Sequence, residues 1–164
     1  MPKPVRPEPS AEPGADVRFP PPLVYLIAIL CGVALWYLLM PLRAPVTRPV
    51  GVVSGLLLVA LAVTLATSAR RLMVSTGQSP IPWKPSPELI LRGPYKFSRN
   101  PMYLGLTVLE IGVGLAFDNL WISLLAFPAL AAVHFIAVLP EERYLSAKFG
   151  EPYRAYLARV RRYI

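Results

Sequence analysis

The sequence has very few residues that could form a disulfide or bind a metal ion. Its 164 residues include one cysteine, Cys31, and one histidine, His134. A single cysteine cannot form a disulfide within the chain, so we expect Cys31 to contribute only to packing. One cysteine and one histidine are also too few for a protein metal cage, and no metal site is expected.

Charged residues are scarce as well. Only 16% of the residues are charged and 55% are hydrophobic, which is too apolar for a small soluble domain. Four apolar runs meet or approach the roughly 20 residues that a membrane-spanning helix needs: Leu23–Leu42, Val50–Ala69, Met102–Phe117 and Trp121–Leu139. The sequence therefore predicts an all-α, polytopic membrane protein with about four transmembrane helices and a cytoplasmic, helical C-terminal tail.

The positive charge follows the pattern of a membrane protein, although the net charge is +8. If the four runs cross a bilayer, one side carries 15 of the lysines and arginines and the other side carries 2. Cytoplasmic segments of membrane proteins are enriched in these residues. We therefore expect a multi-pass protein in a lipid bilayer, with both termini in the cytoplasm and no nucleic-acid partner.

Proline and glycine suggest how the chain is divided. Residues 1–22 hold eight prolines and are expected to be a disordered tail. Residues 23–72 are expected to form a two-helix membrane anchor, and residues 73–164 a functional core. The second helix begins with Gly51 and Gly55, a small-xxx-small spacing that should let it pack closely against the first helix. We favour a monomer over an oligomer built on these glycines.

The loop at residues 75–87 contains four prolines and Trp83, so it should form no regular element. It is either a surface linker or a rigid lid over a functional site.

Two polar clusters flank the last apolar hairpin. One is the turn Gly93–Gly105, which leads straight into the third apolar run, and the other is Pro140–Leu145. If the hairpin folds back, the two clusters meet at one membrane face. Within the hairpin, Glu110 and His134 are polar residues at membrane depth, which usually have a function. We expect them to line a cavity and to orient or deprotonate a substrate, unless they simply pair and hold two helices together.

The two clusters combine groups that suit a zwitterionic amino-acid nucleoside. Glu141 and Glu142 can accept hydrogen bonds from an ammonium and a ribose, although adjacent acids also favour a helix start. Arg99 can hold a ligand carboxylate. Tyr95 and Tyr103 offer rings to an adenine or a sulfonium. The chain lacks the glycine-rich strand–turn–helix motif of soluble dinucleotide-binding domains, which excludes that mode of binding.

In their order and spacing, these residues resemble the isoprenylcysteine carboxyl methyltransferase and phospholipid methyltransferase family of integral membrane enzymes. The resemblance covers roughly residues 76–164 and rests on the following residues: Gly93-Pro94-Tyr95, Arg99 to Gly105, Glu141 to Leu145, Phe149-Gly150, Tyr153, Tyr156 and Val160.

The resemblance implies a methyltransferase that binds S-adenosyl-L-methionine between the last two helices and the tail. The acceptor would be a lipophilic small molecule or a lipidated substrate. With Glu142 added from the argument above, the expected cofactor-binding residues are Leu89, Ile90, Tyr95, Asn100, Pro101, Met102, Tyr103, Glu141 and Glu142. The expected catalytic residues are Arg99, Glu110 and His134.

The sequence departs from the family pattern at two positions. Asn100 stands where the family usually has a histidine, and asparagine cannot titrate near neutral pH. The isoprenylcysteine enzymes also have an arginine about one turn before the glutamate pair, where this chain has Ala137 to Pro140. This second difference weakens the case for a prenylcysteine carboxylate as the acceptor.

Two other functions are compatible with parts of the sequence. An NADPH-dependent membrane reductase of similar scaffold could bind a 2′-phosphate through basic residues near the site, although the two glutamates would repel phosphates. The basic residues are Lys96, Arg99, Arg143 and Lys148. A non-enzymatic four-helix membrane scaffold would need neither polar cluster at a fixed spacing.

Overall fold

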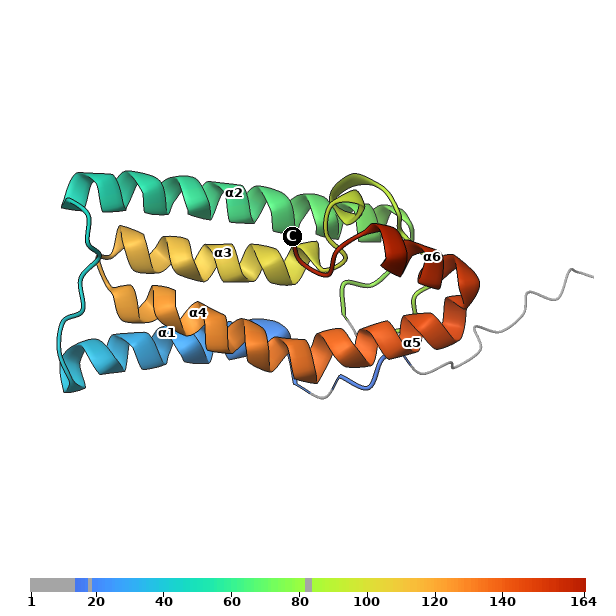
Figure 1. Ribbon diagram of the computed structural model, residues 1–164, viewed down its shortest axis with the longest axis horizontal. Coiled ribbons are helices and arrows are strands. Elements are labelled where there is room, and N and C mark those ends of the chain that lie inside the picture. The colour runs from blue at the N-terminus through green and yellow to red at the C-terminus, as the bar shows by residue number, and fades with distance from the viewer. Residues whose placement is uncertain (1–13, 18, 82–83) are drawn as a thin grey trace, which may run out of the picture.

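The computed structural model describes residues 14–17, 19–81 and 84–164 (Figure 1). Most of the N-terminal tail that we expected to be disordered, and Trp83 of the proline-rich loop, lie outside the described residues.

Every regular element in the described part of the chain is a helix, so the predicted all-α fold is confirmed. The elements are α1 (Pro21–Leu38), α2 (Arg48–Ser75), the short 3-10 helix η1 (Gly93–Lys96), α3 (Pro101–Ala116), α4 (Leu120–Val133), the π-helical segment η2 (His134–Val138), α5 (Leu139–Phe149) and α6 (Glu151–Arg159). Three helices are long and apolar enough to cross a membrane, namely α1, α2 and the continuous rod Leu120–Phe149. The fourth, α3, is also apolar but has only 16 residues.

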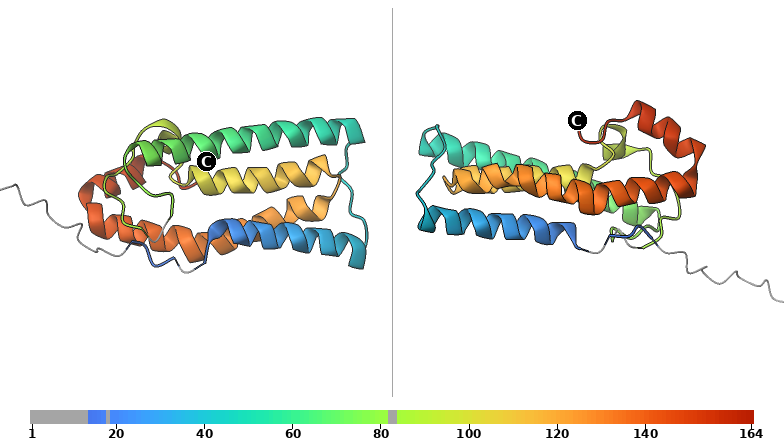
Figure 2. Two further views of the ribbon diagram at one scale, coloured as in Figure 1. Left: turned by 180° about the vertical axis from the view of Figure 1, so that it is seen from behind. Right: turned by 60° about the horizontal axis from the view of Figure 1, so that its bottom comes forward.

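The helices α1 to α4 run side by side, and the connections from α1 to α2 and from α3 to α4 lie at the same end of this bundle (Figure 1). At the other end, α5 continues the rod beyond the bundle and α6 turns back, next to the long loop between α2 and α3 (Figure 2). Gly150, whose φ of +59° favours glycine, separates α5 from α6. The π-helical segment precedes Pro140, which has no N–H to donate to the carbonyl four residues earlier.

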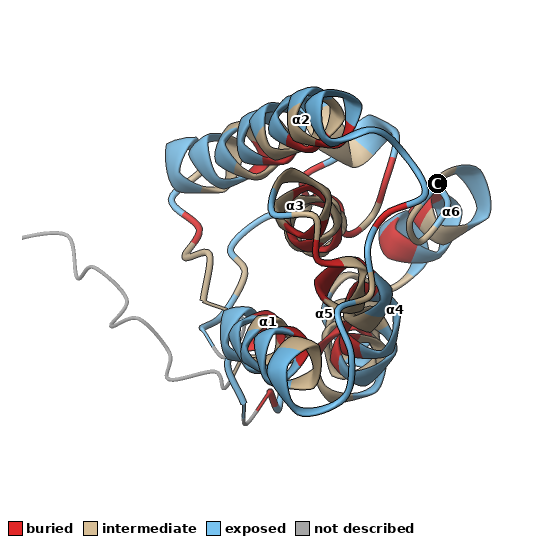
Figure 3. Ribbon diagram, turned by 90° about the vertical axis from the view of Figure 1, so that its left-hand side faces the viewer, coloured by how far each residue is buried: buried red, intermediate tan, exposed pale blue. Residues whose placement is uncertain are grey.

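The third helix lies at the centre, between α2 and α4. Buried residues face inward, whereas the outer faces of α1 and α2 are exposed (Figure 3). Those outer faces carry large apolar side chains such as Leu30, Leu57 and Leu61. An apolar surface of this extent suits lipid and not water.

The glycines at the start of α2 pack against α3, so our expectation that they contact the first helix was wrong. A Cβ atom on Gly55 would lie 2.5 Å from the backbone nitrogen of Ala116 and 2.6 Å from the carbonyl oxygen of Gly112. The first helix packs mainly against α4 instead. The small residues therefore serve a close approach of two backbones within this chain.

The bounds of the first two helices differ from those of the apolar runs. The first helix begins earlier, at Pro21, because proline is well suited to the first turn of a helix, and it ends earlier, at Leu38. The second continues past the expected core boundary at residue 73 as far as Ser75, and Gly77, with a φ of +74°, follows its end. Just before α1, Ala15 and Val17 are buried against the core that includes Val133, so this short part of the tail is packed.

Candidate functional site

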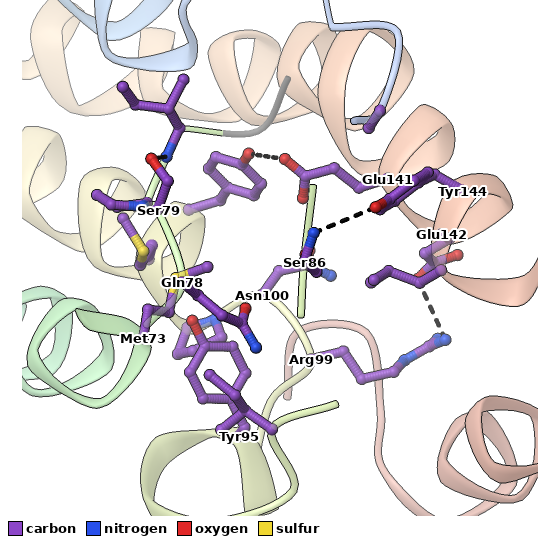
Figure 4. A pocket seen from close by; sticks show the side chains of 18 of the residues that line it. Met73, Gln78, Ser79, Ser86, Tyr95, Arg99, Asn100, Glu141, Glu142 and Tyr144 are labelled. Carbon is purple, nitrogen blue, oxygen red and sulfur yellow. Dashed lines mark hydrogen bonds and ion pairs between the residues drawn. The ribbon is translucent and has the colours of Figure 1, made fainter. Parts of the chain in front are cut away.

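A pocket of about 250 Å³ lies at the end of the bundle where the long loop, the start of α3, α5 and α6 meet (Figure 4). All nine residues predicted to bind a cofactor line it, and so does Arg99. The two remaining candidates, Glu110 and His134, are not among its lining residues. The structure thus brings together the two polar clusters of the sequence and leaves the two polar residues at membrane depth outside the pocket.

Glu141 faces the first turn of α3 across the pocket. Its carboxylate accepts a hydrogen bond of 2.5 Å from the hydroxyl group of Tyr103 (Figure 4). The two residues are 38 positions apart in the chain, so the contact depends on the fold-back of the α3–α4 hairpin. Among the described residues, the carboxylate of Glu141 has no other hydrogen-bond partner. Its second oxygen can therefore accept a hydrogen bond from a ligand.

Glu142, the next residue, is held by two arginines. Arg162 donates to both carboxylate oxygens, from Nε at 3.0 Å and from Nη2 at 2.8 Å. Arg99 Nη1 lies 3.1 Å from Oε1. These hydrogen bonds to Glu142 raise the pKa of Arg162 above its usual value. Both oxygens of Glu142 are therefore engaged within the protein, whereas Glu141 has a hydrogen bond to one oxygen among the described residues.

Arg99 also retains a group that has no partner. Its Nε is buried and makes no hydrogen bond to any described residue. A buried donor of this kind is costly unless a ligand or water satisfies it. Because Arg99 lines the pocket, this donor is a natural position for an anionic group of a ligand.

Asn100, at the start of α3, is fixed by the last residues of the chain. Its side-chain Nδ2 donates to the carbonyl oxygen of Arg162 at 3.0 Å. Its backbone N–H donates to the hydroxyl group of Ser98 at 3.2 Å. The amide oxygen of Asn100 is thereby the end of the side chain that remains available at the pocket.

Aromatic residues form the floor of the pocket beside η1. The hydroxyl group of Tyr156 donates to the backbone carbonyl of Tyr95 at 2.7 Å, which ties α6 to η1. Burial raises the pKa of Tyr156 to about 12 and also raises the pKa of Tyr95 and Tyr153. These phenols are therefore neutral at physiological pH and provide uncharged rings.

The proline-rich loop covers the pocket. Gln78 donates from its side chain to the backbone carbonyl of Glu88, and the backbone N–H of Ser86 donates to the hydroxyl group of Tyr144 at 3.1 Å. The described residues of this loop that line the pocket include Gln78, Ser79 and Ser86 (Figure 4). This arrangement favours the lid interpretation over the linker interpretation.

Several lining residues were not predicted from the sequence. Tyr153 and Tyr156 belong to the residues that carry the family resemblance, but the sequence assigns them no place in the pocket, and the loop residues carry no signal beyond their proline content. The apolar lining from α2 and α3, which includes Ala66, Met73 and Leu106, could not be distinguished from ordinary membrane helix surface.

Glu110 and His134 have separate environments and do not pair with each other. Glu110 is fully buried on α3, and neither carboxylate oxygen has a hydrogen-bond partner among the described residues. His134 Nδ1 lies 2.9 Å from the hydroxyl group of Tyr163 near the end of the chain. The alternative in which these two residues join two helices through a mutual hydrogen bond is therefore wrong for this structure.

The sequence matches the phospholipid methyltransferase family over residues 50–152. The chain belongs to this family, and the protein is accordingly a methyltransferase of membranes. No curated protein and no solved structure matches the chain. The family match begins at the start of α2, well before the polar clusters, and ends at Pro152, so it includes the helix that packs against α3 but not the last twelve residues.

Proposed function

We propose that the protein transfers a methyl group from S-adenosyl-L-methionine to a lipophilic or membrane-associated acceptor. The observation that carries this proposal is the arrangement of opposite charges in one pocket. Among the described residues, Glu141 presents a carboxylate that only Tyr103 engages, and Arg99 presents a buried Nε without a hydrogen-bond partner. A ligand with both an ammonium and a carboxylate would satisfy both groups.

The lining residues fit this methyl donor. Glu141 can accept from the ammonium group or from a ribose hydroxyl, and Arg99 can donate to the carboxylate. The neutral rings of Tyr95 and Tyr153 can pack against an adenine or a sulfonium. Leu89, Ile90, Pro101 and Met102 provide apolar contacts around them.

When bound, the donor supplies a methyl group that is attached to a positively charged sulfonium. After the methyl group is transferred, the rest of the donor is a neutral thioether, which is a good leaving group. The protein then needs mainly to orient the donor and the acceptor and to exclude water. Arg99 and Glu141 would fix the two ends of the amino-acid part. The proline-rich loop, tied to Tyr144, would close the pocket to water on its outer side.

The acceptor would reach the pocket from its apolar side. Ala66, Met73 and Leu106 line the pocket toward the bundle, where the surrounding helices are lipid-facing. At the turn where the isoprenylcysteine enzymes have an arginine, Ala137 and Val138 are fully buried in η2. This favours an acceptor without a carboxylate. The excess of lysine and arginine at the pocket end of the bundle supports a cytoplasmic location for both termini.

The reductase alternative receives less support. Lys96, Arg143 and Lys148 do not line the pocket, and Arg99 is paired with Glu142. Lys84 is the other basic residue that lines the pocket, and it shares the lining with three acids, Glu88, Glu141 and Glu142, which would repel the phosphates of NADPH.

A methyl-transfer assay tests the proposed function. Detergent-purified protein is incubated with S-adenosylmethionine that carries a tritiated methyl group and with a membrane lipid extract, and the organic phase is counted. We expect label in the organic phase with the wild type and with Arg92→Met, which changes an exposed residue of the same turn. We expect loss of transfer with Arg99→Met. Absence of label in the organic phase with folded wild type would contradict a lipophilic acceptor.

A further inference from the structure

The last five residues, Val160–Ile164, form a segment that we call the C-terminal strap. The strap follows α6 and turns back to the start of α3 (Figure 1). The backbone N–H of Arg99 donates to the carbonyl oxygen of Arg161 at 3.0 Å. The carbonyl oxygen of Arg162 accepts from Asn100 Nδ2 at 3.0 Å and from the hydroxyl group of Ser98 at 3.3 Å. The strap therefore holds the backbone and side chains of the turn that enters the pocket.

The side chain of Arg162 adds a second connection. It binds both oxygens of Glu142, and Oε1 of the same carboxylate also contacts Arg99 Nη1. Two guanidinium groups thus share one carboxylate. Because Arg162 occupies both oxygens, Arg99 is limited to one contact at one edge of its guanidinium. This leaves Arg99 Nε without a hydrogen-bond partner in the described part of the chain.

We propose that Arg162 is a positioning residue for the methyl donor. By occupying Glu142, it keeps Arg99 available to the donor carboxylate, and its backbone carbonyl sets the orientation of the Asn100 amide. This inference rests on the proposed function. It concerns a segment beyond the part of the chain that matches the family, which ends at residue 152.

The consequence of losing Arg162 follows from the geometry. Without it, Glu142 has a free oxygen and can bind Arg99 through two hydrogen bonds, a geometry that arginine and carboxylate groups favour. Arg99 would then be drawn away from the ligand. The affinity should fall for donors that carry the amino-acid carboxylate and should stay unchanged for a nucleoside that lacks it.

Arg161 provides a matched control. It is the adjacent residue in the strap, its side chain is exposed, and its contribution to the turn is a backbone carbonyl that a substitution leaves in place. Arg162→Met and Arg161→Met remove the same charge from neighbouring positions, so a difference between them cannot result from net charge.

The test is calorimetric binding of two ligands to detergent-purified full-length protein: S-adenosylhomocysteine, which has the carboxylate, and 5′-methylthioadenosine, which lacks it. We expect Arg162→Met to weaken S-adenosylhomocysteine binding about tenfold or more, a change of about 1.4 kcal/mol, and to leave methylthioadenosine within about twofold. Arg161→Met should match the wild type with both ligands. Arg162→Lys, which keeps the charge but not the two parallel hydrogen bonds, should give an intermediate affinity.

Each result has one meaning. If Arg162→Met weakens the binding of both ligands equally, the role of Arg162 is merely structural and the inference is overturned. The inference is also overturned if Arg162→Met binds S-adenosylhomocysteine with wild-type affinity. If Arg162→Met does not fold, Arg162→Lys decides by the same comparison of two ligands. If folded wild type binds neither ligand, the proposed function itself fails, and the inference fails with it.

Discussion

The carboxylates at the pocket end of the bundle have hydrogen-bond partners, whereas the carboxylate in the interior of the bundle has none among the described residues. At the pocket, Glu141 is held by Tyr103 and Glu142 by two arginines, so each acid has a partner from a distant part of the chain. In the interior, Glu110 is fully buried and has no hydrogen-bond partner among the described residues. In this protein, the polar residue at membrane depth lies outside the pocket, whereas the carboxylates that have hydrogen-bond or ion-pair partners line it.

The interior depends on close packing, and a substitution there should have the largest effect. In Gly55→Leu, the new side chain would meet the backbone of α3, because even a Cβ atom would lie 2.5 Å from the nitrogen of Ala116. We expect the α2–α3 contact to be lost and the yield of folded protein to fall severely, since overpacking alone costs about 1–3 kcal/mol and backbone cannot move aside easily. Size-exclusion chromatography and thermal unfolding in detergent measure this.

Val53→Leu is the control for that substitution, because Val53 lies on the exposed side of the same helix. It should behave like the wild type. A folded Gly55→Leu protein of wild-type stability would show that α2 and α3 do not pack as described.

The pocket end should respond through ligand affinity. Tyr103→Phe removes the hydrogen bond to Glu141 and leaves that carboxylate without a fixed orientation. A hydrogen bond to a charged group contributes about 1.5–3 kcal/mol, so we expect S-adenosylhomocysteine to bind about tenfold more weakly. Tyr37→Phe, at an exposed position near the other end of the bundle, serves as the control. Unchanged affinity in Tyr103→Phe would separate Glu141 from the donor site.

The helices and most of the residues that share the pocket could be predicted from the sequence, but the contacts that hold them in place could not. The apolar runs indicated the helices, and the spacing from Tyr95 to Tyr103 and on to Glu141 indicated which residues share a pocket. The pairing of Glu142 with Arg162 was missed, because it requires the strap to turn back over 20 residues of sequence. The contact of Gly55 with α3 was missed as well, since glycine spacing indicates a close neighbour but does not identify it.

Substitutions of Glu110 test whether this residue takes part in catalysis or affects only the stability of the fold. A buried polar group without a partner costs about 1–3 kcal/mol, so Glu110→Met should raise the thermal stability. Donor affinity should stay within about twofold of the wild type, because Glu110 does not line the pocket. Glu151→Met, at an exposed position of α6, should change neither property. Loss of methyl transfer in Glu110→Gln with donor binding retained would instead support the catalytic role expected from the sequence.

The smallest effect is expected for the hydrogen bond between His134 and Tyr163. His134→Ala and Tyr163→Phe each remove this bond, which should contribute about 0.5–1.5 kcal/mol. We expect a small and similar loss of thermal stability in both, with methyl transfer retained. Loss of turnover in His134→Ala but not in Tyr163→Phe would contradict a purely structural role and favour the predicted catalytic role of His134.

The most direct test of the central claim is calorimetric titration of detergent-purified wild type and Glu141→Ala with S-adenosylhomocysteine, with Glu151→Ala as the control acid on an exposed surface. Our account predicts saturable binding by the wild type and by Glu151→Ala, and a loss of at least about tenfold, or about 1.4 kcal/mol, in Glu141→Ala. Equal binding by all three folded proteins, or binding by none of them, would contradict the assignment of this pocket to S-adenosylmethionine.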